Sequence, residues 1–139
     1  PVTIGWSNAK SAVILKDEVD VVSFHYYKNP ADFKNTLKAL RHKIPKKQLI
    51  LTEFGLSSYQ GVWNLFTSSE TAQERYYRTM QKLLCEQNMS FMSWTLHDFN
   101  AIPEEVVGVL PWRRNTQAHY GFIAKDGRKK KSFKYIATD

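Results

Sequence analysis

The stretch from Gln48 to Gly55 constrains the fold of this chain more than any other. Its residues from Leu49 to Thr52 are apolar or β-branched, a pattern typical of a strand that is buried on both faces, as in a parallel sheet. A carboxylate, Glu53, follows at once. Because parallel α/β folds place their chemistry at the carboxyl ends of their strands, this position predicts a functional acid. The alternative is a glutamate that reaches out to solvent from a strand end.

Strand-like and helix-like patterns alternate along the whole chain. Besides Gln48–Gly55, we expect strands at Val2–Trp6, Val19–Tyr27 and Ser90–Leu96. We expect helices at Ala9–Lys16, from Pro30 to Ile44, up to about Gln87, and from Ser132, with a long loop before about Gln117. This alternation predicts right-handed βαβ units and a parallel sheet. Four such units make about half of a (β/α)8 barrel, whose usual length is about 250 residues.

Cap residues predict the ends of the long helix that finishes near Gln87. At its start, Thr67 with Glu70 and Thr71 with Glu74 match the capping-box spacing. Asn88 is expected to end the helix in the manner of a C-terminal cap.

Length and composition bound the class of protein. The 139 residues are the size of one domain, and the aromatic content of 14% indicates globular material. No apolar run approaches the roughly 20 residues that span a bilayer, so no membrane partner is expected. The single cysteine, Cys85, is expected to be a small buried hydrophobe. The chain starts at Pro1 and is already strand-like there, so we expect it to be a piece of a longer protein.

The net charge of +7 raises the question of nucleic acid as a partner. The positive charge is densest from Lys125 to Lys134, with a smaller block from Arg41 to Lys47. Both blocks are typical of solvated surface, and no recognised nucleic-acid motif accompanies them. We therefore expect no nucleic-acid partner.

Polar and aromatic side chains gather at the expected carboxyl ends of the strands. In chain order these ends carry Gly5-Trp6, then His25-Tyr26-Tyr27, then Glu53, then Trp94 with His97 and Asp98. Alternation along a strand puts His25 and Tyr27 on one face. If the strands are neighbours in chain order, these two side chains lie around Glu53.

At these residues the chain resembles a known family. Four motifs carry the resemblance: His25-x-Tyr27, Leu51-Thr52-Glu53-Phe54-Gly55, Ser93-Trp94, and Tyr120-Gly121-Phe122-Ile123 leading to Asp126-Gly127. In this order they resemble the C-terminal half, from the fifth strand to the eighth helix, of a retaining (β/α)8 glycoside hydrolase. The clan in question includes cellulases, β-mannanases and β-galactosidases. The implied fold class is α/β, the C-terminal half of a TIM barrel, with residues 1–139 as one partial catalytic domain.

The resemblance implies a role for each residue at the strand ends. Glu53 would be the nucleophile of a retaining hydrolysis, which needs two carboxyl groups about 5 Å apart. Tyr27 would donate a hydrogen bond to the charged carboxylate, and His25 would contact or orient the substrate. Trp94 would pack under the apolar face of the sugar. Further substrate contacts are expected from Trp6, His97 and Asp98. The resemblance implies a β-linked glycan as substrate, with neither a cofactor nor a metal.

Each of these side chains also has a purely structural interpretation. His25, Trp94 and Trp6 could be core residues, and His97 could cap its strand. The loop aromatics Tyr59, Trp63 and Trp112 suit either sugar subsites or loop packing.

The second carboxylate is the departure from the family pattern. The family's acid/base is a glutamate preceded by asparagine, and the chain contains no Asn-Glu pair. We therefore expect the acid/base to lie upstream of Pro1 and the fragment alone to be inactive. The unpaired outer strands of a half barrel would be covered by the missing N-terminal half or by a second copy. Relatives that degrade polysaccharides favour a secreted or periplasmic location.

Two other functions remain open from the residues. One is a non-catalytic carbohydrate-binding module that keeps the aromatics and lacks a carboxylate pair. The other is a small α/β domain that uses its basic C-terminus to bind an acidic partner. The sequence does not specify the sugar or the linkage.

Overall fold

The structure is a computed structural model that describes residues 1–61 and 68–136. The chain divides into two compact units, residues 1–54 with 80–93 and residues 55–79 with 94–139. The long helix α2 (Glu70–Glu86) contributes residues to both units.

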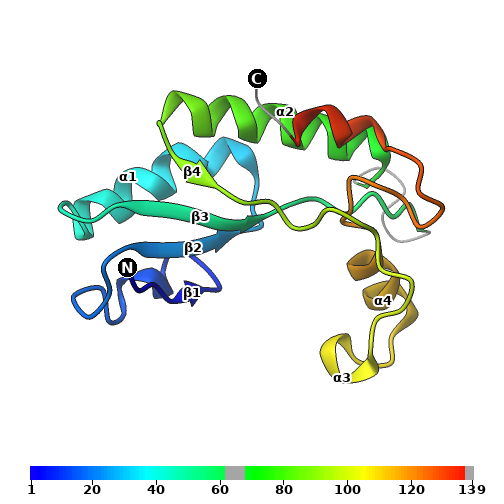
Figure 1. Cartoon of the computed structure of the whole chain (residues 1–139), viewed down its shortest axis with the longest axis horizontal. Helices are drawn as coiled ribbons and strands as arrows, with labels where there is room; N and C mark the ends of the chain where they lie inside the picture. The colour runs from blue at the N-terminus through cyan, green and yellow to red at the C-terminus, as the bar shows by residue number, and fades with distance from the viewer. Residues whose placement is uncertain (62–67, 137–139) are drawn as a thin grey trace. The chain divides into compact units, whose positions relative to one another are not determined.

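The first unit is built on a parallel sheet of four strands. The strands are β1 (Gly5–Trp6), β2 (Val22–Tyr26), β3 (Leu49–Phe54) and β4 (Ser90–Phe91). They pair in the order β1-β2-β3-β4, and every pair is parallel. Figure 1 shows β1, β2 and β3 side by side in chain order. Helical segments separate the strands in the chain, so the prediction of an α/β fold with parallel βαβ units is confirmed.

Helix α1 (Phe33–Lys43) follows β2 and supplies part of the core. Its buried residues Phe33, Leu37 and Leu40 recur at helical spacing, as expected for an amphipathic helix. Pro30 opens a short 3-10 turn, η2 (Pro30–Asp32), where its fixed backbone suits a first helical turn. The helix expected between Pro30 and Ile44 is therefore confirmed.

The central strands β2 and β3 supply several fully buried side chains of this unit. Phe24 and Leu51 are fully buried, and Phe54 is 1% exposed. Phe54 packs edge to face against Phe91, with ring centroids 5.7 Å apart. Residues 49–52 do form a parallel strand, but burial on both faces is wrong, because Leu49 and Leu51 are buried whereas Ile50 and Thr52 are partly exposed.

Several expected elements are shorter than the sequence pattern indicates. The strand expected over Val19–Tyr27 includes only Val22–Tyr26. The first strand includes only Gly5–Trp6, and the last expected strand, Ser90–Leu96, includes only Ser90–Phe91. The helix expected over Ala9–Lys16 is a single 3-10 turn, η1 (Ser11–Val13). Leu15 has a backbone φ of 54°, in the left-handed region, which ends any helix at that point.

Helix α2 begins and ends at identifiable cap residues. The Ser69 hydroxyl accepts a hydrogen bond from the Ala72 backbone N–H at 3.0 Å, so Ser69 is the N-terminal cap. The capping box expected at Thr71 is wrong, because that residue lies inside the helix, and Thr67 lies outside the described residues. Asn88 has a φ of 48°, which confirms it as the C-terminal cap residue.

The expectation that Cys85 is buried is wrong, because its side chain is exposed. It directly follows Leu84, which is fully buried, and successive residues of a helix point about 100° apart. A buried neighbour along the chain therefore does not bury Cys85.

The second unit contains two helices where the sequence suggested a loop. These are α3 (Glu104–Val107) and α4 (Pro111–Ala118). Trp112 thus lies on a helix and not on a loop, and it is 46% exposed. Pro111 occupies the first position of α4, which a proline tolerates because the N–H there has no helical partner. Trp63, the other loop tryptophan, lies outside the described residues.

The core of the second unit forms around Tyr77 and Phe122, whose ring centroids are 4.4 Å apart. Gln73 is fully buried beside them, and its amide nitrogen donates to the backbone carbonyls of Leu56 and Tyr120. The expected last helix is a 3-10 segment, η3 (Lys131–Tyr135). Within the described residues, no helix combines the length and the apolar character that crossing a membrane requires.

Candidate functional site

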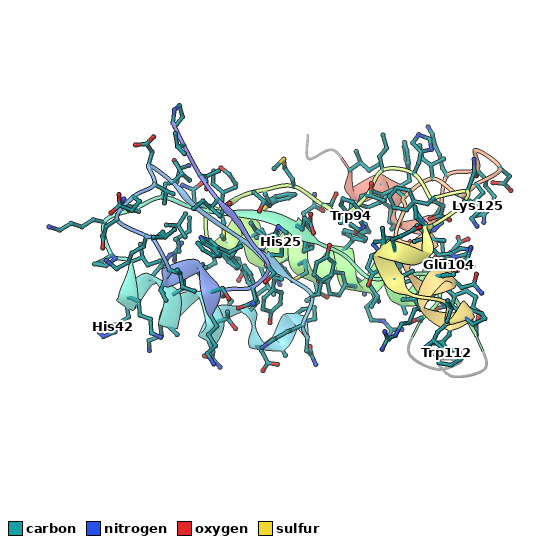
Figure 2. The ribbon with its side chains drawn as sticks, turned by 90° about the horizontal axis from the view of Figure 1, so that it is seen from below. His25, His42, Trp94, Glu104, Trp112 and Lys125 are labelled. Carbon is teal, nitrogen blue, oxygen red and sulfur yellow. The ribbon has the colours of Figure 1, made fainter. Side chains whose placement is uncertain are left out.

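Glu53 lies near the carboxyl end of β3, in the first unit, and two side chains from β2 and its end reach it. The Tyr27 hydroxyl donates a hydrogen bond to Glu53 Oε2 at 2.9 Å. His25 Nδ1 lies 3.2 Å from the same oxygen. The Glu53 side chain is 30% exposed, and that of His25 is 20% exposed. The hydrogen bond between Tyr27 and Glu53, which the family resemblance implied, is therefore present. Figure 2 labels His25 among the side chains of β2.

A β-bulge sets this geometry. Phe24 pairs with Leu51, but His25 pairs with Glu53, so Thr52 is the extra residue on β3. Without the bulge, His25 would lie opposite Thr52. The bulge moves Glu53 level with His25, which illustrates how bulges next to functional sites re-aim a side chain. The sequence pattern gave no signal for it.

The two carboxylate oxygens of Glu53 have different surroundings. Oε2 accepts the hydrogen bond from the Tyr27 hydroxyl and lies 3.2 Å from the His25 ring nitrogen Nδ1. Among the described residues, Oε1 has no hydrogen-bond partner. An ionised carboxylate with one oxygen held and the other open is suited to nucleophilic attack or to binding a cationic centre.

Trp94 belongs to the second unit. Its backbone carbonyl accepts a hydrogen bond from the Tyr77 hydroxyl at 3.0 Å, and its ring packs against Phe99 with centroids 5.8 Å apart. Its indole Nε1 is buried and is, within the described residues, the one buried side-chain polar atom without a partner. Burial raises the pKa of Tyr77 far above its usual range, so this hydroxyl remains a donor. The role of Trp94 under a sugar stays a prediction.

The other expected substrate contacts occupy different environments. Trp6 is half-buried on β1, where its backbone lies level with Phe24 of β2. His97 is exposed, and its backbone forms a parallel bridge with Ile123 in the second unit. Substrate contact by Trp6 or His97 remains a prediction.

The interpretation of Asp98 as a sugar-binding residue requires correction. Its side chain is 2% exposed, and Oδ1 lies 2.7 Å from Lys130 Nζ, whose own side chain is 2% exposed. The same oxygen accepts the Gly121 N–H at 2.8 Å. Oδ1 is therefore occupied by internal partners, so this oxygen is not available to bind a sugar hydroxyl. A Cβ at position 121 would lie 2.2 Å from the Asp98 nitrogen, so this close approach requires glycine.

Several residues of the basic C-terminal block form ion pairs with carboxylates of the second unit. Arg128 pairs with Glu70 at 2.6 Å, and Lys134 pairs with Glu74 at 2.7 Å. Lys130 is buried, with its pKa lowered by burial and partly restored by the neighbouring carboxylate. The interpretation of the whole block as solvated surface is therefore wrong for Lys130. The sequence pattern did not reveal this, because the partner Asp98 lies 32 residues away in the chain.

Comparison with known families matches residues 6–104 to the family described as glycosyl hydrolase catalytic core. The chain belongs to this glycosyl hydrolase family. Comparison with curated proteins finds no match. Within the described residues, no group of three or more His, Cys, Asp or Glu side chains could hold a metal ion.

Solved glycosidase structures share the fold of this glycosyl hydrolase chain. A family 17 β-1,3-glucanosyltransferase from Rhizomucor miehei aligns at TM-score 0.66 and 16% identity, over 93% of this chain and 48% of its own. An endo-laminarinase from Formosa aligns at TM-score 0.69 and 15% identity, over 91% of this chain and 44% of its own. A β-glucuronidase from Ruminococcus gnavus aligns at TM-score 0.71 and 16% identity, over 98% of this chain and 25% of its own.

The chain thus spans about half of these structures or less. With four parallel strands alternating with helical segments, it has the fold of part of a TIM-barrel glycosidase. The fold class implied by the sequence motifs is confirmed.

Proposed function

We propose that this glycosyl hydrolase chain is part of a catalytic domain that cleaves β-linked glycans by a retaining double displacement, with Glu53 as nucleophile. The observation that carries the proposal is the asymmetric environment of the Glu53 carboxylate. The Tyr27 hydroxyl donates to Oε2 at 2.9 Å, His25 Nδ1 lies 3.2 Å from the same oxygen, and Oε1 has no hydrogen-bond partner among the described residues. The family membership and the fold support glycoside hydrolysis as the reaction class.

In the first displacement, Oε1 of Glu53 attacks the anomeric carbon and forms an ester bond to the sugar. The bond from that carbon to the leaving oxygen breaks, and the leaving oxygen takes a proton from an acid. In the second displacement, water attacks the same carbon and releases the carboxylate. The conjugate base of the acid removes the proton from the water.

The contacts to Oε2 have two physical effects in this scheme. They fix the carboxylate plane, so that Oε1 is already oriented when the sugar arrives. They also stabilise the carboxylate anion, which is the leaving group of the second displacement. A hydrogen bond to a charged group contributes about 1.5–3 kcal/mol. Trp94, Trp6 and His97 are proposed substrate contacts in the same scheme.

The acid/base is proposed to be a glutamate outside residues 1–139, because the family pattern of asparagine followed by glutamate does not occur in the sequence. Residues 1–139 would then be one partial catalytic domain, inactive alone, with the N-terminal half of the barrel or a second copy against the outer strands.

A non-catalytic carbohydrate-binding module is the second candidate. The observation that favours it is that this chain supplies Glu53 without an Asn-Glu pair. Such a module would bind oligosaccharides and hydrolyse none, even in the full-length protein.

Replacing Glu53 by Gln in the full-length protein tests the proposal. The variant keeps the size of the side chain and removes the charged nucleophile, so turnover of β-glycosides should be abolished. Glu18→Gln, a surface change at the amino-terminal side of β2, serves as the matched control and should retain full turnover. Retained activity in the Glu53 variant contradicts the assignment, and an inactive wild-type protein that binds oligosaccharides supports the binding module.

A further inference from the structure

Tyr77 is a buried residue of α2 whose hydroxyl reaches the backbone of Trp94. The residue is 2% exposed, and its hydroxyl donates a hydrogen bond to the Trp94 carbonyl at 3.0 Å. Burial raises the pKa of Tyr77 far above its usual range, so the hydroxyl keeps its proton and remains a donor. Tyr77 itself takes no part in the proposed displacement steps.

Gly55 leaves the space in which this hydrogen bond forms. A Cβ at position 55 would lie 2.4 Å from the Trp94 carbonyl oxygen and 3.0 Å from the Tyr77 hydroxyl oxygen. Any larger residue would therefore have to displace the carbonyl, so the contact requires glycine at this position. Gly55 follows Glu53 and Phe54 in the chain, so Trp94 is held against the backbone that directly follows the proposed nucleophile.

The residues that follow Trp94 are held by the same core. Phe122 packs against the Tyr77 ring with centroids 4.4 Å apart, and its backbone N–H donates to the Leu96 carbonyl at 2.9 Å. The Trp94 indole packs against Phe99, and its buried Nε1 has no hydrogen-bond partner within the described residues. In this part of the chain, the place of the indole therefore depends on how its backbone is held and on ring packing.

We propose that Tyr77 is a positioning residue, which holds Trp94 where its indole packs under the sugar to be cleaved. This inference rests on the proposed function, in which Trp94 contacts the substrate. A side chain that is fixed before the ligand arrives loses less conformational entropy on binding. Removal of the Tyr77 hydroxyl should therefore weaken the binding of the sugar, although Tyr77 acts only through Trp94.

Titration calorimetry on the full-length Glu53→Gln protein, which is the parent for these measurements, tests the inference without turnover. The probes are a β-1,3-linked and a β-1,4-linked glucan oligosaccharide. In this parent, Tyr77→Phe should raise the Kd of a probe that binds by about 3- to 10-fold, the range expected for one hydrogen bond.

Tyr76→Phe is the matched control. Tyr76 is the neighbouring tyrosine of the same helix, is 8% exposed, and forms no hydrogen bond with Trp94 in the described residues. The change removes a hydroxyl from the same part of the core, and it should leave Kd within about 2-fold of the parent value.

Two further readouts separate positioning from a general loss of stability. Calorimetry gives the number of binding sites and Kd independently, so a variant that is partly unfolded loses sites and keeps its Kd. In a Trp94→Ala background, Tyr77→Phe should change Kd by less than about 2-fold, because the side chain that Tyr77 positions is gone. A loss of sites at unchanged Kd, or a full effect without the indole, overturns the inference.

The outcomes also separate this inference from the proposed function. Turnover by the Glu53→Gln protein contradicts the proposed function itself. If that protein is inactive and binds a probe, but Tyr77→Phe and Tyr76→Phe change Kd equally, only the positioning role of Tyr77 fails. If neither probe binds the parent, Trp94 has no glucan to accept, and the positioning role is overturned.

Discussion

Replacing Lys130 by Met is expected to destabilise the protein strongly. The substitution removes the ammonium that lies 2.7 Å from Asp98 Oδ1 and 2.8 Å from the Ser58 hydroxyl oxygen. It leaves the Asp98 carboxylate, 2% exposed, with the Gly121 N–H as its remaining hydrogen-bond donor among the described residues. Breaking a buried ion pair from one side costs about 3–5 kcal/mol, because the remaining charge is uncompensated. Such a loss is a large part of the free energy of unfolding of a typical protein, which is about 5–15 kcal/mol.

Urea unfolding of the full-length protein, followed by tryptophan fluorescence, measures the free energy of unfolding. Lys125→Met is the matched control, since Lys125 is an exposed lysine of the same basic block, and it should change the free energy by less than about 0.5 kcal/mol. Replacing Lys130 by Met and Asp98 by Leu together should recover most of the loss, because no charge then remains buried. A loss below about 1 kcal/mol for the single change would refute the buried ion pair.

Three further changes have defined outcomes. Leu51→Ala, at a fully buried position of β3, should lower the free energy of unfolding by about 2–5 kcal/mol in the same urea assay, and a cost below about 1 kcal/mol would contradict its place in the core. The hydrogen bond from Arg128 holds the pKa of Glu70 below its ordinary 4.5, so the stability from this pair is present above about pH 4.5 and is lost as pH falls through the lowered pKa. The free energy of unfolding should therefore depend less steeply on pH in the acid range in Glu70→Gln than in the wild type, and identical pH profiles would exclude the pair. Tyr27→Phe should reduce kcat for β-glycosides about 10- to 150-fold, from the loss of one charge-assisted hydrogen bond to Glu53, and steady-state kinetics showing unchanged kcat would remove Tyr27 from the site.

Local patterns were sufficient to predict the elements that rely on nearest neighbours in the chain. The helical spacing of Phe33, Leu37 and Leu40 predicts a buried face that the structure has, and the apolar run of β3 predicts a strand of which one face is buried in the structure. The approach of Tyr27 to Glu53 could also be predicted from the sequence. Alternation along the strand places Tyr27 on the same face as His25, and strands that follow one another in the chain are usually neighbours in a parallel sheet.

The features that the sequence did not reveal depend on distant or subtle contacts. The bulge at Thr52 shifts the pairing of Glu53 and Phe54 with β2 by one residue and leaves the apolar pattern of the sequence intact. The ion pair between Asp98 and Lys130 joins positions 32 residues apart, and each partner alone has the character of a surface residue. Helix α4 is polar for most of its length, so a proline near its start looked like a loop signal.

The most direct test of the central claim is chemical trapping of the nucleophile. The full-length protein is incubated with a 2-fluoro β-glycoside that carries a good leaving group, and its peptides are analysed by mass spectrometry. The fluorine destabilises the oxocarbenium-like transition states, so a covalent glycosyl-enzyme accumulates. If Glu53 is the nucleophile, one sugar is attached to the peptide that contains Glu53, and the Glu53→Gln protein carries no label. A sugar attached to a different carboxylate would contradict this assignment.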